Sequence, residues 1–128
     1  MAIILVIDDS KMSRNMIIKA VRALGHETLE AENGQIGLEM LMKHKPDVVT
    51  VDMLMPVMNG IEFLSAIRKD NNQTPVIVIT ADIQEETRRE CEEFDVHFLN
   101  KPFKEQELIA ALSVAAKVKG KADEIKSR

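Results

Sequence analysis

Hydrophobic residues in this chain alternate between short continuous runs and longer periodic stretches. Three runs, at residues 3–7, 48–51 and 76–79, are rich in β-branched residues, which is typical of strands buried on both faces of a sheet. Weaker runs at residues 27–31 and 96–99 predict strands at or near the edges of the same sheet.

The stretches between these runs carry apolar residues with a helical period. Gly25 is expected to end the first helix, Asn33 to cap the second, and the last helix to begin near Lys104. Five strand–helix pairs in strict alternation predict an α/β fold, with a right-handed parallel sheet covered by helices on both sides. The expected inward faces include Met12, Met16, Ile17, Ala20, Val21 and Leu24 on the first helix, and Ile36, Leu38, Leu41 and Met42 on the second.

A fourth helix, predicted over residues 84–94, has only a thin apolar stripe. The stripe consists of Ile83, Thr87, Cys91 and Phe94. A solvated surface helix and a mobile surface that binds a partner both fit this pattern, and the sequence leaves both open.

Length and composition are those of one globular domain. The chain has 128 residues, 45% of them hydrophobic and 30% charged. Its formal net charge of -4 argues against a nucleic-acid binder, which would carry a basic patch. No apolar run approaches the about 20 residues that span a membrane, and no secretory signal precedes the first predicted strand, so we expect a cytoplasmic protein. The single cysteine, Cys91, is expected in the core rather than as a reactive thiol.

Polar residues stand where four of the predicted strands end. Asp8 and Asp9 follow the first strand, Asp52 follows the third, and Thr80 and Lys101 end the last two. The carboxyl ends of parallel strands meet at one edge of a sheet, where such folds place their ligands. We therefore expect three carboxylates, a hydroxyl and an ammonium to converge on one site.

This set of groups suits phosphoryl transfer. Three crowded carboxylates repel one another, and a hard divalent ion such as Mg²⁺, which prefers oxygen ligands, would relieve that repulsion. If Asp52 accepted a phosphoryl group, the metal and Lys101 would neutralise its oxygens and Thr80 would donate a hydrogen bond. A carboxylate can act as the nucleophile and form an aspartyl phosphate.

Each of these residues also has a structural explanation on its own. Asp8 or Asp9 can cap the helix that follows, Thr80 can close a turn, Lys101 can be a surface charge, and Asp52 can be a loop acid. Their joint position after separate hydrophobic strands favours the functional interpretation.

Four segments, LVIDDSKMSR, VDMLMPVMNGIEFL, VIVITA and NKPF, occur in an order and at a spacing that resemble a known family. The chain resembles the response-regulator receiver domain of two-component signalling, close to the stand-alone chemotaxis (CheY-like) type, over residues 2–117. The resemblance implies a flavodoxin-like, doubly wound sheet of five parallel strands in the order 2-1-3-4-5. It also implies a receiver domain over residues 1–118, and we expect residues 119–128 to be a frayed or disordered tail.

The resemblance assigns roles to the acidic residues. Asp52 is implied to be the phosphoacceptor. Asp9, Asp52 and the backbone carbonyl of Leu54 are implied to hold Mg²⁺, with Asp8 acting largely through a bound water.

The resemblance also implies how the phosphoryl group would be read. Thr80 and Lys101 would bind its oxygens, and the bond from Lys101 to Pro102 would be cis. When the Thr80 hydroxyl turns toward the phosphoryl group, Phe98 would fill the vacated space. The surface of the fourth helix, fifth strand and fifth helix would then change shape.

Three positions depart from the family pattern. Phe98 replaces a frequent tyrosine, Phe94 stands where a glycine usually ends the fourth helix, and Leu54 stands where chemotaxis relatives often carry a polar side chain. These departures concern the switch, the path of one loop and the lifetime of the phosphoryl group.

The sequence favours a monomeric phospho-switch over its rivals. Its implied partners are a histidine kinase or phosphotransfer domain and a downstream protein, such as a motor switch or relay protein. An excised receiver fragment would look the same. An aspartate-nucleophile phosphatase would carry Asp-x-Asp rather than the adjacent Asp8 and Asp9, and a pseudo-receiver would lack functional residues that are present. The three histidines are too dispersed to form a transition-metal site.

Overall fold

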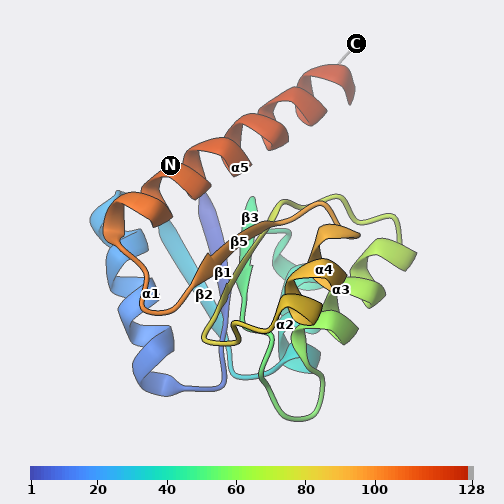
Figure 1. Cartoon of the computed structure of the whole chain (residues 1–128). Coiled ribbons are helices and arrows are strands. Elements are labelled where there is room, and N and C mark those ends of the chain that lie inside the picture. Colours follow the sequence, from blue (N-terminus) through green and yellow to red (C-terminus); the bar gives the residue numbers. More distant parts are fainter. Residues whose placement is uncertain (127–128) are drawn as a thin grey trace.

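The fold is a parallel β-sheet between two layers of helices (Figure 1). The computed structural model describes the backbone of residues 1–126 and the side chains of residues 1–115. Within this part of the chain the strand order is β2-β1-β3-β4-β5, so the predicted flavodoxin-like topology is confirmed. The strands are β1 Ile3–Ile7, β2 Glu27–Ala31, β3 Val48–Val51, β4 Val76–Thr80 and β5 His97–Asn100.

The helices cover both faces of the sheet. In Figure 1, α1 and α5 lie on one side, and α2, α3 and α4 lie on the other. The helices are α1 Lys11–Ala23, α2 Gly34–His44, α3 Gly60–Lys69, α4 Glu85–Glu92 and α5 Glu105–Lys126.

Alternate residues of the central strands enter two separate cores. On β1, Leu5 and Ile7 pack with α2 and α3, whereas Ile4 and Val6 pack with α1 and α5. Successive side chains of a strand point to opposite faces, so a strand covered on both sides must be apolar throughout. This explains the continuous apolar runs in the sequence.

The ends of the first helices follow their local sequence signals. Asn33 caps α2 by accepting a hydrogen bond from the backbone N–H of Ile36, as predicted. Gly25 adopts a φ of 87°, a left-handed conformation that glycine tolerates, directly after α1 ends at its C-cap Leu24.

The predicted inward face of α1 is wrong in part. Met12 and Met16 are 76% and 60% exposed, and the buried residues of the helix are Ile17, Ile18 and Val21. The face is centred between Ile17 and Ile18, and at about 100° per residue Met16 lies well outside it. Met42 on α2 is likewise exposed, because Leu41 takes the inward position.

Helix α4 is shorter than predicted and lightly buried. Ile83 is exposed, and Cys91 is the buried residue of the helix, 1% exposed. Burial, together with the charges of Glu90 and Asp82, raises the pKa of the Cys91 thiol to about 11. The expectation that Cys91 is a core residue is therefore confirmed.

The loop after α4 turns one residue later than the family glycine position. Phe94 packs against the core on the α2 and α3 side, and Asp95 adopts the left-handed conformation with a φ of 54°. Aspartate tolerates this conformation better than most residues, so the turn forms without glycine.

The C-terminal part of the chain lies in α5, which runs to Lys126. The predicted boundary at residue 118 falls where side chains are outside the described part of the chain, and residues 127–128 are outside it altogether. The predicted tail therefore stays a prediction. No helix in the described part is long and apolar enough to cross a membrane.

Candidate functional site

Sheet-like backbone hydrogen bonds continue past three strand ends and fix the residues that follow. The N–H of Asp8 donates to the carbonyl of Ala31 at 3.0 Å, and the N–H of Asp52 donates to the carbonyl of Ile7 at 3.1 Å. The N–H of Lys101 donates to the carbonyl of Thr80 at 2.8 Å. The sheet therefore aims these side chains at one point.

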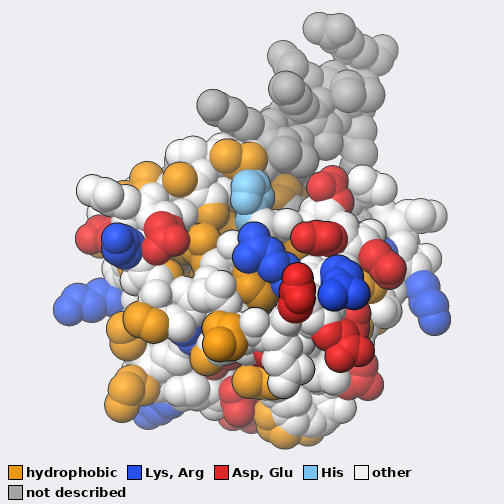
Figure 2. Space-filling model, in the orientation of Figure 1, with side chains coloured by type: hydrophobic (Ala, Val, Ile, Leu, Met, Phe, Trp, Pro, Cys, Tyr) orange, Lys and Arg blue, Asp and Glu red, His pale blue; other side chains and the backbone are white. Residues whose placement is uncertain are grey.

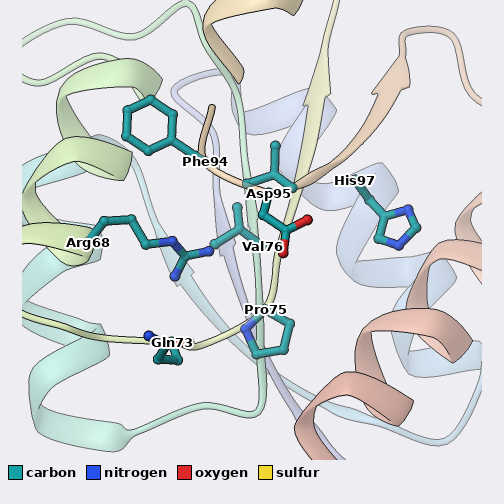
Figure 3. A pocket seen from close by; sticks show the side chains of 8 residues that line it. Arg68, Gln73, Pro75, Val76, Phe94, Asp95 and His97 are labelled. Carbon is teal, nitrogen blue, oxygen red and sulfur yellow. The ribbon is translucent and has the colours of Figure 1, made fainter. Parts of the chain in front are cut away.

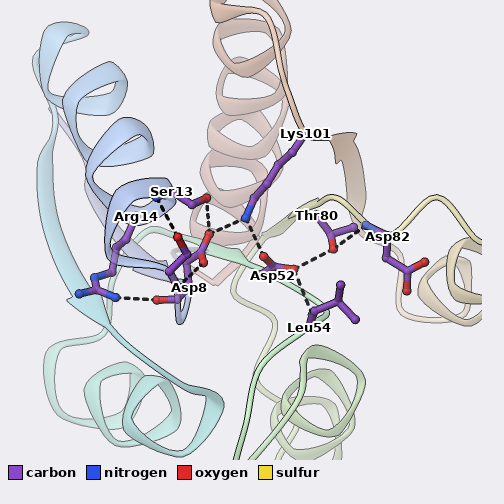
Figure 4. Close-up of polar contacts among 9 residues, drawn as sticks. Asp8, Ser13, Arg14, Asp52, Leu54, Thr80, Asp82 and Lys101 are labelled. Atoms are coloured by element: carbon purple, nitrogen blue, oxygen red, sulfur yellow. Dashed lines mark hydrogen bonds and ion pairs between the residues drawn. The ribbon is translucent and has the colours of Figure 1, made fainter.

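Lys101 bridges the two buried carboxylates of the site (Figure 4). Its Nζ lies 2.7 Å from Asp8 Oδ2 and 2.6 Å from Asp52 Oδ2. Asp8 is 0% exposed and Asp52 is 6% exposed, so water screens these charges poorly. Segments about 40 to 90 residues apart in sequence meet here, as the strand-end pattern predicts.

The second oxygen of Asp52 is also engaged. Its Oδ1 accepts a hydrogen bond from the Thr80 hydroxyl at 2.7 Å and another from the N–H of Leu54 at 3.0 Å. Thr80 is fully buried. Both oxygens of Asp52 therefore face fixed donors.

Helix α1 holds Asp8 through two residues that the sequence analysis missed. The Ser13 hydroxyl donates to Asp8 Oδ2 at 2.7 Å, and Arg14 Nη1 donates to the Asp8 carbonyl oxygen at 2.7 Å. Arg14 also pairs with Glu30 at 2.9 Å. The only sequence signal was the presence of polar residues in the first turn of α1, directly after the acidic pair.

The ammonium of Lys101 stays charged in this setting. Burial lowers its pKa, but the hydrogen bonds and charges of Asp52 and Asp8 raise it by more, so the net pKa lies above the usual value for lysine. A fixed positive charge next to Asp52 is what stabilisation of an anionic group requires.

The acidic residues suit a hard divalent cation. Oxygen atoms of Asp8, Asp9 and Asp52 all lie within 4.8 Å of one another. Asp9 is exposed and the other two are buried, so one side of the cluster opens to solvent. One ammonium against three carboxylates leaves a negative balance, and this donor set fits Mg²⁺.

A glycine positions the loop that carries Asp52. The N–H of Gly60 donates to the carbonyl of Met53 at 3.2 Å, so the start of α3 lies directly on the loop backbone. A Cβ at position 60 would lie 2.7 Å from the carbonyl oxygen of Asp52 and would clash with the side chain of Met53. The Asn59–Gly60 pair is a turn signal whose packing role only the structure reveals.

Phe98 lies on β5, which pairs with the strand β4 that ends at Thr80. It pairs in register with Val78 and packs on the same core as α2 and α3. The Arg88 guanidinium of α4 lies 5.5 Å from the centroid of its ring, within cation–π range. The Lys101–Pro102 bond is cis in the structure.

Comparison with known proteins places this site in a family. The family model described as the response regulator receiver domain matches residues 4–113. The chemotaxis protein CheY of Thermotoga maritima is 33% identical over 116 residues, which cover 89% of this chain and 97% of that protein. The phosphate regulon transcriptional regulatory protein PhoB of Pseudomonas aeruginosa is 32% identical over 123 residues, which cover 94% of this chain and 54% of that protein.

Solved structures agree with these sequence matches. The chemotaxis protein CheY4 of Vibrio cholerae superposes with a TM-score of 0.82 at 31% identity, covering 90% of this chain and 98% of that one. The chain spans between 15% and 54% of the length of four curated relatives. The family match over residues 4–113 shows that the chain belongs to the response regulator receiver domain family, whose members are phosphoacceptor signalling modules rather than classical enzymes.

Proposed function

We propose that this receiver takes a phosphoryl group from the phosphohistidine of a histidine kinase or phosphotransfer domain onto Asp52. The observation that carries the proposal is the position of Asp52, whose two oxygens meet Lys101 on one side and Thr80 with the N–H of Leu54 on the other. A carboxylate in such a setting is a positioned nucleophile with donors ready for the incoming charge.

In the proposed reaction, an oxygen of Asp52 attacks phosphorus as the phosphorus–nitrogen bond of the phosphohistidine breaks. The electron pair of that bond stays on the imidazole, and the product is an aspartyl phosphate. Lys101 and Thr80, which hold Asp52 at 2.6 and 2.7 Å, exchange part of this contact for the phosphoryl oxygens. Asp9, Asp52 and the Leu54 carbonyl, with Asp8 acting through a water, would hold Mg²⁺, which would supply charge neutralisation to the transferred group.

We further propose that phosphorylation changes the surface formed by α4, β5 and α5. Movement of the Thr80 hydroxyl toward the phosphoryl group would let Phe98 move inward, and the new surface would control a downstream protein. The match to the chemotaxis protein CheY of T. maritima, which covers 97% of that protein, supports a chemotaxis role.

Intact mass spectrometry tests the phosphoacceptor. Wild-type protein incubated with acetyl phosphate and Mg²⁺ is expected to gain one phosphoryl group, and Asp52→Asn is expected to gain none. Asp70→Asn, which changes an exposed aspartate outside the site, serves as the matched control and should react like wild type. A phosphoryl group that still appeared on Asp52→Asn would overturn the assignment.

A further inference from the structure

A chain of hydrogen bonds runs from Asp52 to α4 and passes through Asp82. The Thr80 hydroxyl, which donates to Asp52, accepts a hydrogen bond from the N–H of Asp82 at 3.2 Å. The carboxylate of Asp82 accepts from the N–H of Gln84 at 2.9 Å and from the Thr87 hydroxyl at 2.8 Å. Figure 4 shows this carboxylate turned away from Asp52, so Asp82 faces the site with its backbone and α4 with its side chain.

Asp82 replaces a cap that α4 lacks. The first three helices are capped by the side chains of Ser10, Asn33 and Asn59, respectively. In the described part of the chain, Gln84 at the N-cap position of α4 makes no such side-chain bond. The Asp82 carboxylate instead binds the N–H of Gln84 and the Thr87 hydroxyl of the first turn, and a negative charge there is also favourable to the helix dipole.

Few other contacts hold the N-terminal half of α4. Its buried residue, Cys91, lies near the other end. The Arg88 guanidinium lies over the Phe98 ring, and the ion pair between Arg89 and Glu85 is exposed and 3.8 Å long. Figure 2 shows charged side chains gathered over the side of the molecule where α4 lies. A short helix with so little apolar burial opens easily, so the Asp82 contacts weigh heavily in its first turn.

The Thr80 hydroxyl has one proton to donate, and it cannot serve both Asp52 and a phosphoryl oxygen. When the hydroxyl turns to a phosphoryl group, the long bond from the N–H of Asp82 must adjust with it. We propose that Asp82 is a positioning residue, which orients the Thr80 hydroxyl through its backbone and ties that orientation to the first turn of α4 through its carboxylate. This inference rests on the proposed phosphorylation of Asp52.

Thr87→Val tests the link, because it keeps the shape of residue 87 and removes only the bond to Asp82. Amide hydrogen exchange of residues 85–92 would be measured without ligand and with beryllofluoride plus Mg²⁺, a stable mimic of the phosphoryl group. In wild type we expect faster exchange in the loaded state. In Thr87→Val we expect faster exchange before loading, by about fivefold for one lost hydrogen bond, and a smaller ratio between the two states.

Glu86→Gln is the matched control, since it alters an exposed residue of the same turn. It should keep the wild-type ratio between the loaded and unloaded states. If Asp82 only capped the helix, Thr87→Val would accelerate exchange equally in both states and the ratio would stay unchanged, which would overturn the inference.

Asp82→Ala gives an independent reading at the site. It should slow phosphorylation by acetyl phosphate about tenfold at saturating Mg²⁺, because without the carboxylate bonds to Gln84 and Thr87 the loop no longer fixes the Asp82 N–H that orients the Thr80 hydroxyl. Its Mg²⁺ affinity should remain that of wild type. Phosphorylation at the wild-type rate would count against the inference, whereas a wild-type protein that accepted no phosphoryl group would instead refute the proposed function.

Discussion

At the edge of the sheet where the strands end, called the carboxyl edge, the charged side chains of Asp8, Asp52 and Lys101 bond to one another. At the edge where the strands begin, called the amino edge, charged side chains bond to the backbone. Asp47 Oδ2 accepts the N–H of Ile3 at 2.8 Å and so fixes the start of β1. At the opposite edge, the contacts of Lys101 at 2.6 and 2.7 Å join side chains only.

The amino edge also holds a pocket of about 310 Å³ (Figure 3). Its walls are charged like those of the acidic site, but the charged groups bind different partners. Arg68, Asp95 and His97 line it. Arg68 Nη1 donates to the carbonyls of Asn72 and Thr74 at 2.7 and 3.2 Å, so the guanidinium is committed to the loop before β4. Burial lowers the pKa of Arg68, and the charge of Asp95 offsets this only in part.

The difference shows which polar clusters can do chemistry. Bonds between charged side chains can be exchanged for bonds to a ligand while the backbone stays in place. Bonds to loop carbonyls cannot be given up without exposing unpaired backbone groups, which costs about 1–3 kcal/mol per group. The side chains at the carboxyl edge can therefore exchange their bonds for bonds to a ligand, whereas the Arg68 bonds at the amino edge stabilise the loop before β4.

Lys101→Ala gives the largest expected effect, because it removes the ion pairs with Asp8 and Asp52 at the carboxyl edge and leaves the amino edge unchanged. Loss of the ammonium should slow phosphorylation of Asp52 by acetyl phosphate about hundredfold, as for removal of one donor that stabilises a developing charge. Mg²⁺ binding should survive, because the lysine competes with the metal for Asp8 and Asp52. Calorimetric titration checks this, and complete loss of Mg²⁺ binding in folded protein would show that the roles are assigned wrongly.

Asp9→Ala should weaken Mg²⁺ binding by well over tenfold, since a direct oxygen ligand is lost from the exposed side of the cluster. Titration calorimetry measures the affinity, with Asp70→Ala as a control for the loss of one exposed carboxylate. Equal affinity in wild type and Asp9→Ala would contradict the proposed ligand set.

Arg68→Met, at the amino edge, should lower the stability of the protein and leave the phosphorylation rate unchanged. It keeps the aliphatic stem but leaves the carbonyls of Asn72 and Thr74 unpaired, so the free energy of unfolding should fall by about 2 kcal/mol. Phosphorylation should proceed at the wild-type rate. Urea unfolding and the acetyl phosphate assay together check both halves, and Lys69→Met controls for the loss of a neighbouring exposed charge. Slower phosphorylation with an unchanged free energy of unfolding would show that Arg68 serves the reaction rather than the loop before β4.

The sequence predicts the carboxyl edge well because strand periodicity and strand ends are local signals. Asp8, Asp52, Thr80 and Lys101 each follow an apolar run, and parallel pairing brings them together whatever their rotamers. The fold follows from the same alternation of short runs and helical stretches.

Other features depend on side-chain packing that no local pattern specifies. The bonds of Ser13 to Asp8 and of Asp82 to Thr87 require particular rotamers on neighbouring elements. Helical period alone did not fix the phase of α1, because Met16 and Ile18 are both apolar and only one of them faces the sheet.

Leu54→Asn gives the smallest expected effect and refines the chemistry of the carboxyl edge. Hydrolysis of an aspartyl phosphate needs a water in line with the bond that breaks, and Leu54, two residues after Asp52, is 57% exposed beside it. Leucine cannot hydrogen-bond that water, whereas asparagine can, so dephosphorylation should accelerate about tenfold, or about 1.4 kcal/mol of barrier. The contact of the residue 54 N–H with Asp52 does not involve the side chain and should persist.

Val57→Asn, at an exposed apolar residue of the same loop, is the matched control and should leave the lifetime of the phosphoryl group unchanged. If Leu54→Asn kept its phosphoryl group as long as wild type with Mg²⁺ saturating in both, access of water would have to be set by the buried donors around Asp52 rather than by the side chain that overhangs it.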